Sequence, residues 1–316
     1  MSERVDEFSR ESCCLFPLIN TLLDSFKIFL RNFRIFLSIF ALTTLPLSLL
    51  LFSLSLHSHP IQSQIYHLES LAFSSSTRFE ARHVWKESRA DAVSLLRIKA
   101  LFSIPCYVLS LLSVITAVNS TALAFHGRRP SFSTAVLAVK TAWKRPFVTS
   151  LYVYSLMMAY AAVLRTLAAA FVGAPVPRLV VAVVGAVLEI HLMAVLSMGL
   201  VVSVNEDRFG LEAIRIGSGL MEGRRVSGWV LSCLLVLVSG CIGWELEGLM
   251  DGQELLGKWY SWAPTVMMGV LSFGDKVGLV CMYALVALWS FVVSTVFYCE
   301  CRKRHPIGSE NEPIPV

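Results

Sequence analysis

Two ionisable residues stand in stretches that are otherwise apolar, and they are the first candidates for chemistry. Arg165 lies in "AYAAVLRTLAAAF" (residues 159–171), and Glu189 lies in the next apolar stretch. A charge near the middle of a bilayer costs about 2.5–3.5 kcal/mol on insertion scales, so it usually faces other helices and finds a partner. We therefore predict that Arg165 and Glu189 form an ion pair. Two alternatives remain open: Arg165 extends to the headgroups while Glu189 is protonated, or both groups serve transport.

The spacing of the two residues is compatible with a pair. The segment between them, "GAPVPR", is short and contains two prolines, so the flanking helices form an antiparallel hairpin. Arg165 lies about ten residues before the turn and Glu189 about thirteen or fourteen after it, a difference in depth of roughly 4–5 Å. Small residues surround both positions and allow close approach of the helices: Ala161, Ala162, Ala168 and Ala169 in the first, Ala182, Gly185 and Ala186 in the second.

The other residues with chemical potential have simpler explanations. His191 is two positions from Glu189, about 200° around a helix, so the two do not share a face. The acidic stretch 243–262 could bind a divalent cation, but a solvated loop beside an aromatic belt explains it as well. The sequence contains no GxSxG, P-loop or HExxH motif and no cysteine pair at zinc spacing. We predict no enzyme activity, no cofactor and no metal.

The elements that carry these residues follow from the composition. Of the 316 residues, 55% are hydrophobic and 16% are charged, and the mean hydropathy is +0.66. Soluble domains average about 25% charged residues. Six stretches are long enough to cross a hydrocarbon core of about 30 Å, and in lipid they must be helices. They lie at about 33–56, 99–125, 147–171, 179–204, 227–248 and 277–299.

The predicted fold is therefore an all-α, polytopic membrane helical bundle in which six transmembrane helices form three hairpins. We predict one integral membrane domain over 1–316, with a cytoplasmic segment at 1–32, a membrane region at 33–299 and a cytoplasmic tail at 300–316. Lys and Arg gather in the N-terminal segment, the second and fourth loops and the tail, which places both termini in the cytoplasm. The first loop is also rich in basic residues, but acidic residues partly offset them. This topology accounts for the net charge of +5 without nucleic acid.

A pattern recurs three times, over Leu22–Phe40, Phe132–Tyr154 and Phe209–Ser232: an amphipathic stretch, a basic cluster, then an apolar helix. We predict that an interfacial amphipathic helix precedes each hairpin, although basic flanks alone would also follow from the topology. Six basic residues are candidates for contact with lipid headgroups: Arg31, Arg34, Lys144, Arg145, Arg224 and Arg225.

Two segments carry a resemblance to a known group. "VVSVNEDRFGLEAIRIGSGLMEGRR" and "VKTAWKRPFVTSLYVYSL" resemble segments of a plant-type family of uncharacterised six-pass transmembrane proteins. That family is similar in layout to the membrane domain attached to some glycerophosphodiester phosphodiesterases. The matching positions are Trp143, Lys144, Arg145, Glu206, Gly210, Ala213, Gly223 and Arg224. The resemblance implies membrane residence and no chemistry, because nothing here encodes the phosphodiesterase barrel.

Three classes of function fit a protein of this kind. A non-enzymatic scaffold, membrane-organising or partner-binding protein in the endoplasmic reticulum or plasma membrane fits best. The alternative is a transporter or channel for a small molecule or lipid that uses Arg165 and Glu189; a lipid enzyme lacks an acid–base or metal cluster. A polar cavity through the bundle would indicate transport, and a filled bundle would indicate a scaffold. The cysteines near the termini, Cys13, Cys14, Cys299 and Cys301, are candidates for palmitoylation.

Overall fold

The computed structural model describes residues 18–74, 78–171, 175–259 and 265–304. Across these residues the chain is almost entirely helical and contains no strand, so the predicted all-α class is confirmed. Six helical spans are long and apolar enough to cross a membrane: Phe33–Leu68, Arg82–Phe125, Lys144–Ala170, Val176–Asn205, Arg225–Leu246 and Lys276–Arg304. Each overlaps one of the six predicted stretches, and the chain is a multi-pass membrane protein.

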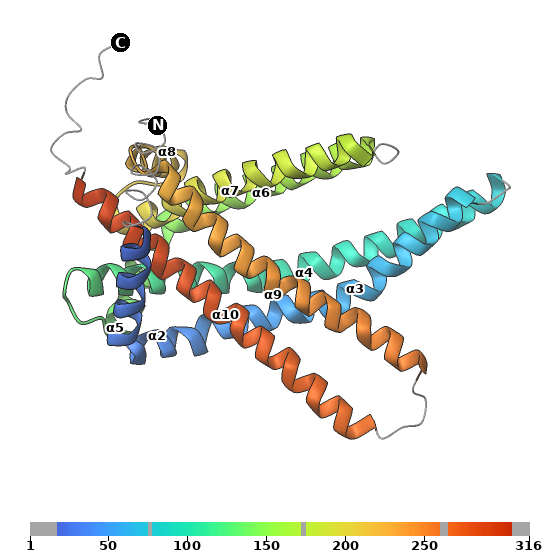
Figure 1. Cartoon of the computed structure of the whole chain (residues 1–316), viewed down its shortest axis with the longest axis horizontal. Coiled ribbons are helices and arrows are strands. Elements are labelled where there is room, and N and C mark those ends of the chain that lie inside the picture. The colour runs from blue at the N-terminus through green and yellow to red at the C-terminus, as the bar shows by residue number, and fades with distance from the viewer. Residues whose placement is uncertain (1–17, 75–77, 172–174, 260–264, 305–316) are drawn as a thin grey trace, which may run out of the picture. The chain divides into compact units, whose positions relative to one another are not determined.

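Three short helical segments alternate with three pairs of long helices. Residues 18–31 form a helix that leads into α2 (Phe33–Ile39), the π-helix η1 (Phe40–Thr44) and α3 (Leu45–Ser74), after which α4 (Arg78–Phe125) follows. The second set is α5 (Phe132–Ala142), α6 (Lys144–Ala170) and α7 (Pro175–Asn205), and α6 and α7 run side by side as a hairpin (Figure 1). The third set is α8 (Gly210–Leu220), α9 (Arg225–Trp259) and α10 (Thr265–Arg304).

Several helices extend beyond the predicted membrane stretches. Most of the predicted first loop is helical, because α3 continues to Ser74 and α4 begins at Arg78. With 48 residues, α4 is about 72 Å long at 1.5 Å per residue, more than twice the hydrocarbon thickness. The acidic stretch after residue 243 is helical through Trp259, and α10 continues to Arg304, past the predicted start of the tail. Hydropathy marks where lipid can solvate a helix, not where the helix ends.

The chain, for which we predicted a single domain, divides into two compact units. The first unit comprises residues 1–39, 111–241 and 286–316, and the second comprises 40–110 and 242–285. The second unit contains η1 and α3 together with parts of α4, α9 and α10. In it the ring of His57 in α3 lies 6.3 Å from that of Phe102 in α4, measured between centroids.

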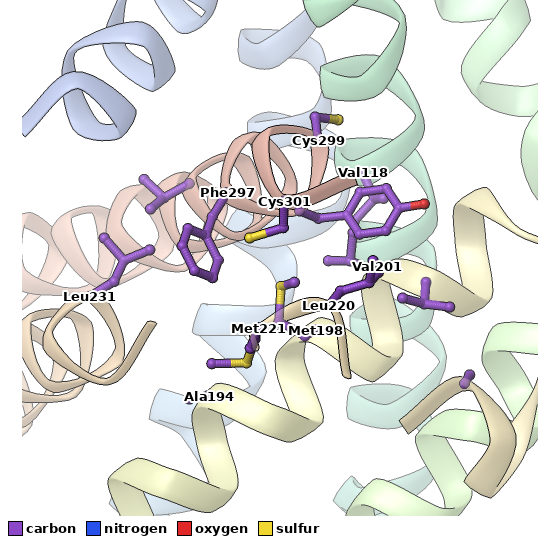
Figure 2. Packing of buried hydrophobic residues seen from close by; sticks show 14 of the residues in the cluster. Val118, Ala194, Met198, Val201, Leu220, Met221, Leu231, Phe297, Cys299 and Cys301 are labelled. Carbon is purple, nitrogen blue, oxygen red and sulfur yellow. The ribbon is translucent and has the colours of Figure 1, made fainter. Parts of the chain in front are cut away.

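The first unit has a well-packed apolar core. Buried side chains of α4, α7, α8, α9 and α10 form one cluster around Val118, Met198, Met221 and Phe297. Figure 2 shows Phe297 near Met221, where α10 faces the end of α8. A hollow beside these residues has a volume of only about 10 Å³, about the space that one water molecule needs. This part of the protein is filled.

Two glycines allow α8 to lie directly against α7. A Cβ atom on Gly217 would stand 2.8 Å from the backbone nitrogen of Gly199, and one on Gly199 would stand 2.8 Å from the Cα of Ile214. Such distances are possible only without side chains, so the two helix backbones are in close contact. The contact fixes α8 beside the end of α7, where the charged residues of the next section gather.

Candidate functional site

A cluster of polar side chains lies in the first unit, near the ends of α7 and α10. We call it the polar junction, and its members come from four segments: Thr21, Glu206, Arg224, Tyr298, Glu300 and Arg302. Thr21 lies on the helix 18–31, Glu206 directly follows α7, Arg224 directly precedes α9, and the other three lie on α10. The junction therefore joins the beginning of the described chain to its end.

Glu300 is the first acceptor in the polar junction. Its carboxylate accepts a hydrogen bond from the guanidinium of Arg224 at 2.7 Å, and the Thr21 hydroxyl lies 3.0 Å from both carboxylate oxygens. The side chain of Arg224 is 8% exposed and that of Glu300 is 20% exposed. The Arg224 guanidinium also lies 5.6 Å from the ring centroid of Phe297, within the range of a cation–π contact. The ion pair is therefore largely buried, and each partner has a further contact: Glu300 with Thr21, and Arg224 with Phe297.

Glu206 is the second acceptor. The Tyr298 hydroxyl donates to its Oε1 at 2.5 Å, and Nε of Arg302 lies 3.3 Å from the same oxygen. The side chains of Arg302 and Glu206 are mostly buried. Tyr298, Glu300 and Arg302 alternate along α10, so successive members lie about 200° apart around the helix. Tyr298 and Arg302 therefore contact Glu206 on one side of α10, and Glu300 contacts Arg224 on the other side.

Local backbone geometry places Arg224. Gly223 has a φ of +83°, in the left-handed region that costs a residue with a side chain about 1–2 kcal/mol. The turn is closed by the amide of Arg224, which donates to the carbonyl of Met221 at 2.9 Å. The carbonyl of Arg224 then accepts from the amide of Gly228 at 3.1 Å and so begins α9. The "MEGRR" sequence thus turns the chain so that Arg224 points inward.

A second set of contacts fastens the start of α8 to α6. Arg145 pairs with Asp207 at 2.5 Å; the side chain of Arg145 is 42% exposed and that of Asp207 is 87% exposed. The amide of Gly210 donates to the hydroxyl of Thr149 at 2.9 Å, a buried hydrogen bond. Together with the contacts of Glu206, these contacts show that the segment "NEDRFG" at the end of α7 connects α6 and α10.

The contacts within the polar junction hold helices together. Its two carboxylates and two guanidinium groups pair with one another, and its two hydroxyls donate to the carboxylates. Each carboxylate accepts from one guanidinium and one hydroxyl, so the cluster joins the four segments that carry its members. No group of three or more His, Cys, Asp or Glu side chains that could hold a metal ion occurs among the residues described here.

The comparison with family models finds a match over nearly the whole chain. Residues 7–309 match the model of a family described as a domain of unknown function (DUF8558). The chain belongs to the DUF8558 family. No curated protein and no solved structure matches it. The match spans all three sets of helices, so the DUF8558 region includes the whole polar junction. The likeness to the membrane domain attached to some glycerophosphodiester phosphodiesterases stays a prediction.

The structure does not bring the predicted intramembrane pair together in this DUF8558 chain. Arg165 is exposed on the surface of α6, and no ion pair joins it to Glu189 among the contacts of the described residues. The α6–α7 contact instead involves Gly185, which faces Leu164, and the hydroxyl of Tyr160 donates to the Gly185 carbonyl at 2.5 Å. Arg165 follows Leu164 by one residue, or about 100° around the helix, which turns it away from the contact.

The six candidates for headgroup contact divide into three groups. Arg31, Arg34 and Lys144 are exposed; Arg145 and Arg225 are at least partly exposed and pair with Asp207 and Glu222. Arg224 differs from the prediction, since it is buried in the polar junction and its charge is directed at Glu300. Arg225 follows it directly in the sequence, so of the two adjacent arginines after the turn at Gly223 the first is buried and the second is exposed.

Two further predictions receive a structural description. The ring of His191 packs against that of Trp229 on α9, with centroids 5.2 Å apart, and its Nδ1 has no hydrogen-bond partner among the described residues. Cys299 and Cys301 are buried, and Figure 2 shows them leaving α10 in different directions. Burial of both thiols argues against palmitoylation there; Cys13 and Cys14 lie outside the described residues.

Proposed function

We propose that the protein is a non-enzymatic membrane scaffold that holds three amphipathic segments along the cytoplasmic leaflet. We call these segments, residues 18–31, α5 and α8, the collar. The observation that carries the proposal is the polar junction, because its buried pairs tie the first collar segment to the start of α9 and to α10. Pairs that join four segments hold those segments in fixed positions, which a scaffold requires.

The exposed surface of the collar supports a position at the membrane. Apolar side chains of residues 18–31 are exposed at alternating spacings of four and three, the period of one helix face: Ile19, Leu23, Phe26 and Leu30. Val136 and Leu137 on α5 and Leu211 on α8 are also exposed. An interfacial helix buries such a face about 5–10 Å into the boundary between headgroups and acyl chains. The boundary between headgroups and acyl chains would remove these apolar side chains from water.

The filled core of the first unit favours the scaffold over a transporter. Transport pathways usually contain several polar groups or broken helices near the middle of the membrane. The hollow beside Met198 and Phe297 has a volume of about 10 Å³, and the two charges proposed for a pathway, Arg165 and Glu189, do not meet. The same proposal places both termini in the cytoplasm, in the endoplasmic reticulum or plasma membrane, with other membrane proteins as partners.

Proximity labelling in cells tests this function. A labelling enzyme is fused to the C-terminus of the wild type, of Glu300→Ala and of Leu137→Glu, with Glu222→Ala as the control. We expect a defined set of neighbouring proteins that is kept by Glu222→Ala and lost by both other variants at equal membrane levels. Leu137→Glu changes only the exposed face of α5, so it reports on the collar even where Glu300→Ala lowers the protein level.

Two results would overturn the scaffold. One is a set of neighbours that neither variant changes, because the collar then has no part in the assembly. The other is uptake of a solute from a cytosolic metabolite extract into proteoliposomes that contain the purified protein, with loss of uptake in Glu189→Gln. That result would establish the transporter in its place.

A further inference from the structure

An open groove in the first unit has a charge that nothing in the described chain balances. Its volume is about 730 Å³, within the range of about 300–1,000 Å³ found for small-molecule sites. One wall is the stretch from Leu30 to Ser38, and the other is the segment from Arg129 to Phe132 that leads into α5. Three arginines line it, two on the first wall and one on the second: Arg31, Arg34 and Arg129.

The backbone under both walls is ordered by its own hydrogen bonds. At the end of α4, Gly127 has a φ of +76°, its amide donates to the Ala124 carbonyl at 3.1 Å, and the next amide, of Arg128, donates to the Leu123 carbonyl at 3.0 Å. This is a Schellman motif, which ends the helix and fixes the direction in which the chain leaves it. On the opposite wall, the side-chain amide of Asn32 donates to the Ile28 carbonyl at 3.1 Å.

The second wall is also fixed at its far end. Ser131 caps α5: its hydroxyl accepts from the amide of Thr134 at 3.3 Å, and the Thr134 hydroxyl accepts from the Ser131 amide at 3.0 Å. Arg129 therefore lies between a closed helix end and a capped helix start, four residues in all from Gly127 to Pro130. Its Cα position is set before any ligand arrives.

The arginines of the groove differ from the other buried or interfacial arginines of the unit. Arg145, Arg224 and Arg302 each pair with a carboxylate. Arg31, Arg34 and Arg129 are exposed, have no ion pair with any residue that the structure describes, and share the groove with no acidic lining residue. Guanidinium groups bind phosphate oxygens through paired hydrogen bonds, so three of them around one groove make a site for a strongly anionic group.

Apolar residues in the same groove indicate what the anionic group is attached to. Leu30 and Phe33 belong to the lining, and they continue the exposed apolar face of residues 18–31. Phe132 on the opposite wall is also exposed. A soluble phosphate compound would leave these side chains in water, whereas a phospholipid would cover them with its acyl chains while its headgroup meets the arginines.

We propose that this groove binds an anionic phospholipid whose headgroup carries a phosphate monoester, as in phosphatidic acid or a phosphorylated phosphatidylinositol. A monoester carries a charge of about −1.5 to −2 near pH 7, which suits three guanidinium groups better than the single charge of a phosphodiester. The inference rests on the proposed function only in placing the groove at the cytoplasmic leaflet. The collar would then bind one specific class of lipid in addition to having a general affinity for the membrane.

Native mass spectrometry of the delipidated full-length protein in detergent tests the proposal. The added probes are phosphatidic acid, phosphatidylinositol 4-phosphate, phosphatidylglycerol and phosphatidylcholine, and the soluble probes are inositol trisphosphate and inorganic phosphate. We expect one lipid per chain with the monoester lipids, and binding about tenfold or more weaker with the other two, since a phosphodiester offers fewer charged oxygens for hydrogen bonds from the arginines.

Two sets of variants distinguish the groove from general charge. The groove set is Arg31→Gln, Arg34→Gln and Arg129→Gln together, and the control set is Arg128→Gln, Lys140→Gln and Arg215→Gln together, which removes the same net charge from exposed positions outside the groove. We expect the groove set to weaken binding of the monoester lipids about tenfold or more and the control set to change it less than about twofold, with unchanged thermal unfolding in both.

Each other outcome overturns the proposal. Equal loss in the two sets means that lipid is attracted by the basic surface as a whole. Binding of inositol trisphosphate or phosphate as tight as that of the lipids means that the groove is a site for soluble anions. No adduct with any monoester lipid means that the groove holds none. None of these results affects the set of neighbouring proteins by which the scaffold is tested, so the two proposals fail separately.

Discussion

Glu300→Ala is the perturbation for which the structure makes the strongest prediction. It removes the carboxylate that accepts from Arg224 at 2.7 Å and from Thr21 at 3.0 Å. Breaking a fully buried pair by removing one partner costs about 3–5 kcal/mol, because the other charge stays buried without compensation. Arg224 is 8% exposed and Glu300 is 20% exposed, so some water reaches the pair. We expect a loss of about 2–4 kcal/mol in the free energy of unfolding.

Unfolding by sodium dodecyl sulfate in mixed micelles, followed by tryptophan fluorescence, measures this loss. The adjacent pair of Arg225 and Glu222 is the matched control: it is 61% and 72% exposed, so Glu222→Ala should cost no more than about 0.5 kcal/mol. A double-mutant cycle over Arg224→Ala and Glu300→Ala should give a coupling energy of about 1–3 kcal/mol. A coupling no larger than that of the control pair would refute the view that the junction fastens the unit.

Three further predictions concern the packing around the junction. In α8, Gly217→Ala should lower the free energy of unfolding by about 1–3 kcal/mol, because its Cβ would lie 2.8 Å from the backbone of α7. Gly219→Ala has open space around its Cβ and should be neutral or mildly stabilising. A similar thermal shift for both variants would contradict the close contact. Tyr298→Phe should lower the same unfolding free energy by about 1.5–3 kcal/mol, since it removes a donor to a carboxylate; no measurable change would mean that the bond is not formed. Acyl-exchange labelling of the cellular protein should be the same for the wild type and for the double variant Cys299→Ser and Cys301→Ser, because both thiols are buried; a decrease in the variant would show that α10 exposes them.

Most of the fold could be predicted from the sequence because its main determinant is the solvent. A stretch of about 20 apolar residues has few alternatives to a membrane helix, whatever its neighbours are. The short helices before the second and third hairpins were also predicted, from the amphipathic stretches that begin at Phe132 and Phe209. The ends of the long helices were not, because α3 and α4 continue beyond the apolar residues that define a span.

The candidate site was harder to predict, for two physical reasons. Arg165 and Leu164 are neighbours in one small-residue stretch, and only the rotation of α6 against α7 decides which of them faces Gly185. Glu300 was assigned to the tail because it follows the last apolar residue by a single position. One signal was available: it is the only acidic residue among five basic or cysteine neighbours in "CECRKR". Its partner in the first collar segment was beyond reach, since no single sequence reveals a contact over 279 positions.

That separation has a consequence for how the protein is made. Thr21 and Arg224 leave the ribosome long before Glu300, which is 279 and 76 positions further along. Until the last helix is inserted, Arg224 has no counter-ion and must be held by water, lipid phosphate or the insertion machinery. A chain that stops before residue 300 therefore lacks the carboxylate with which Arg224 pairs in the complete unit.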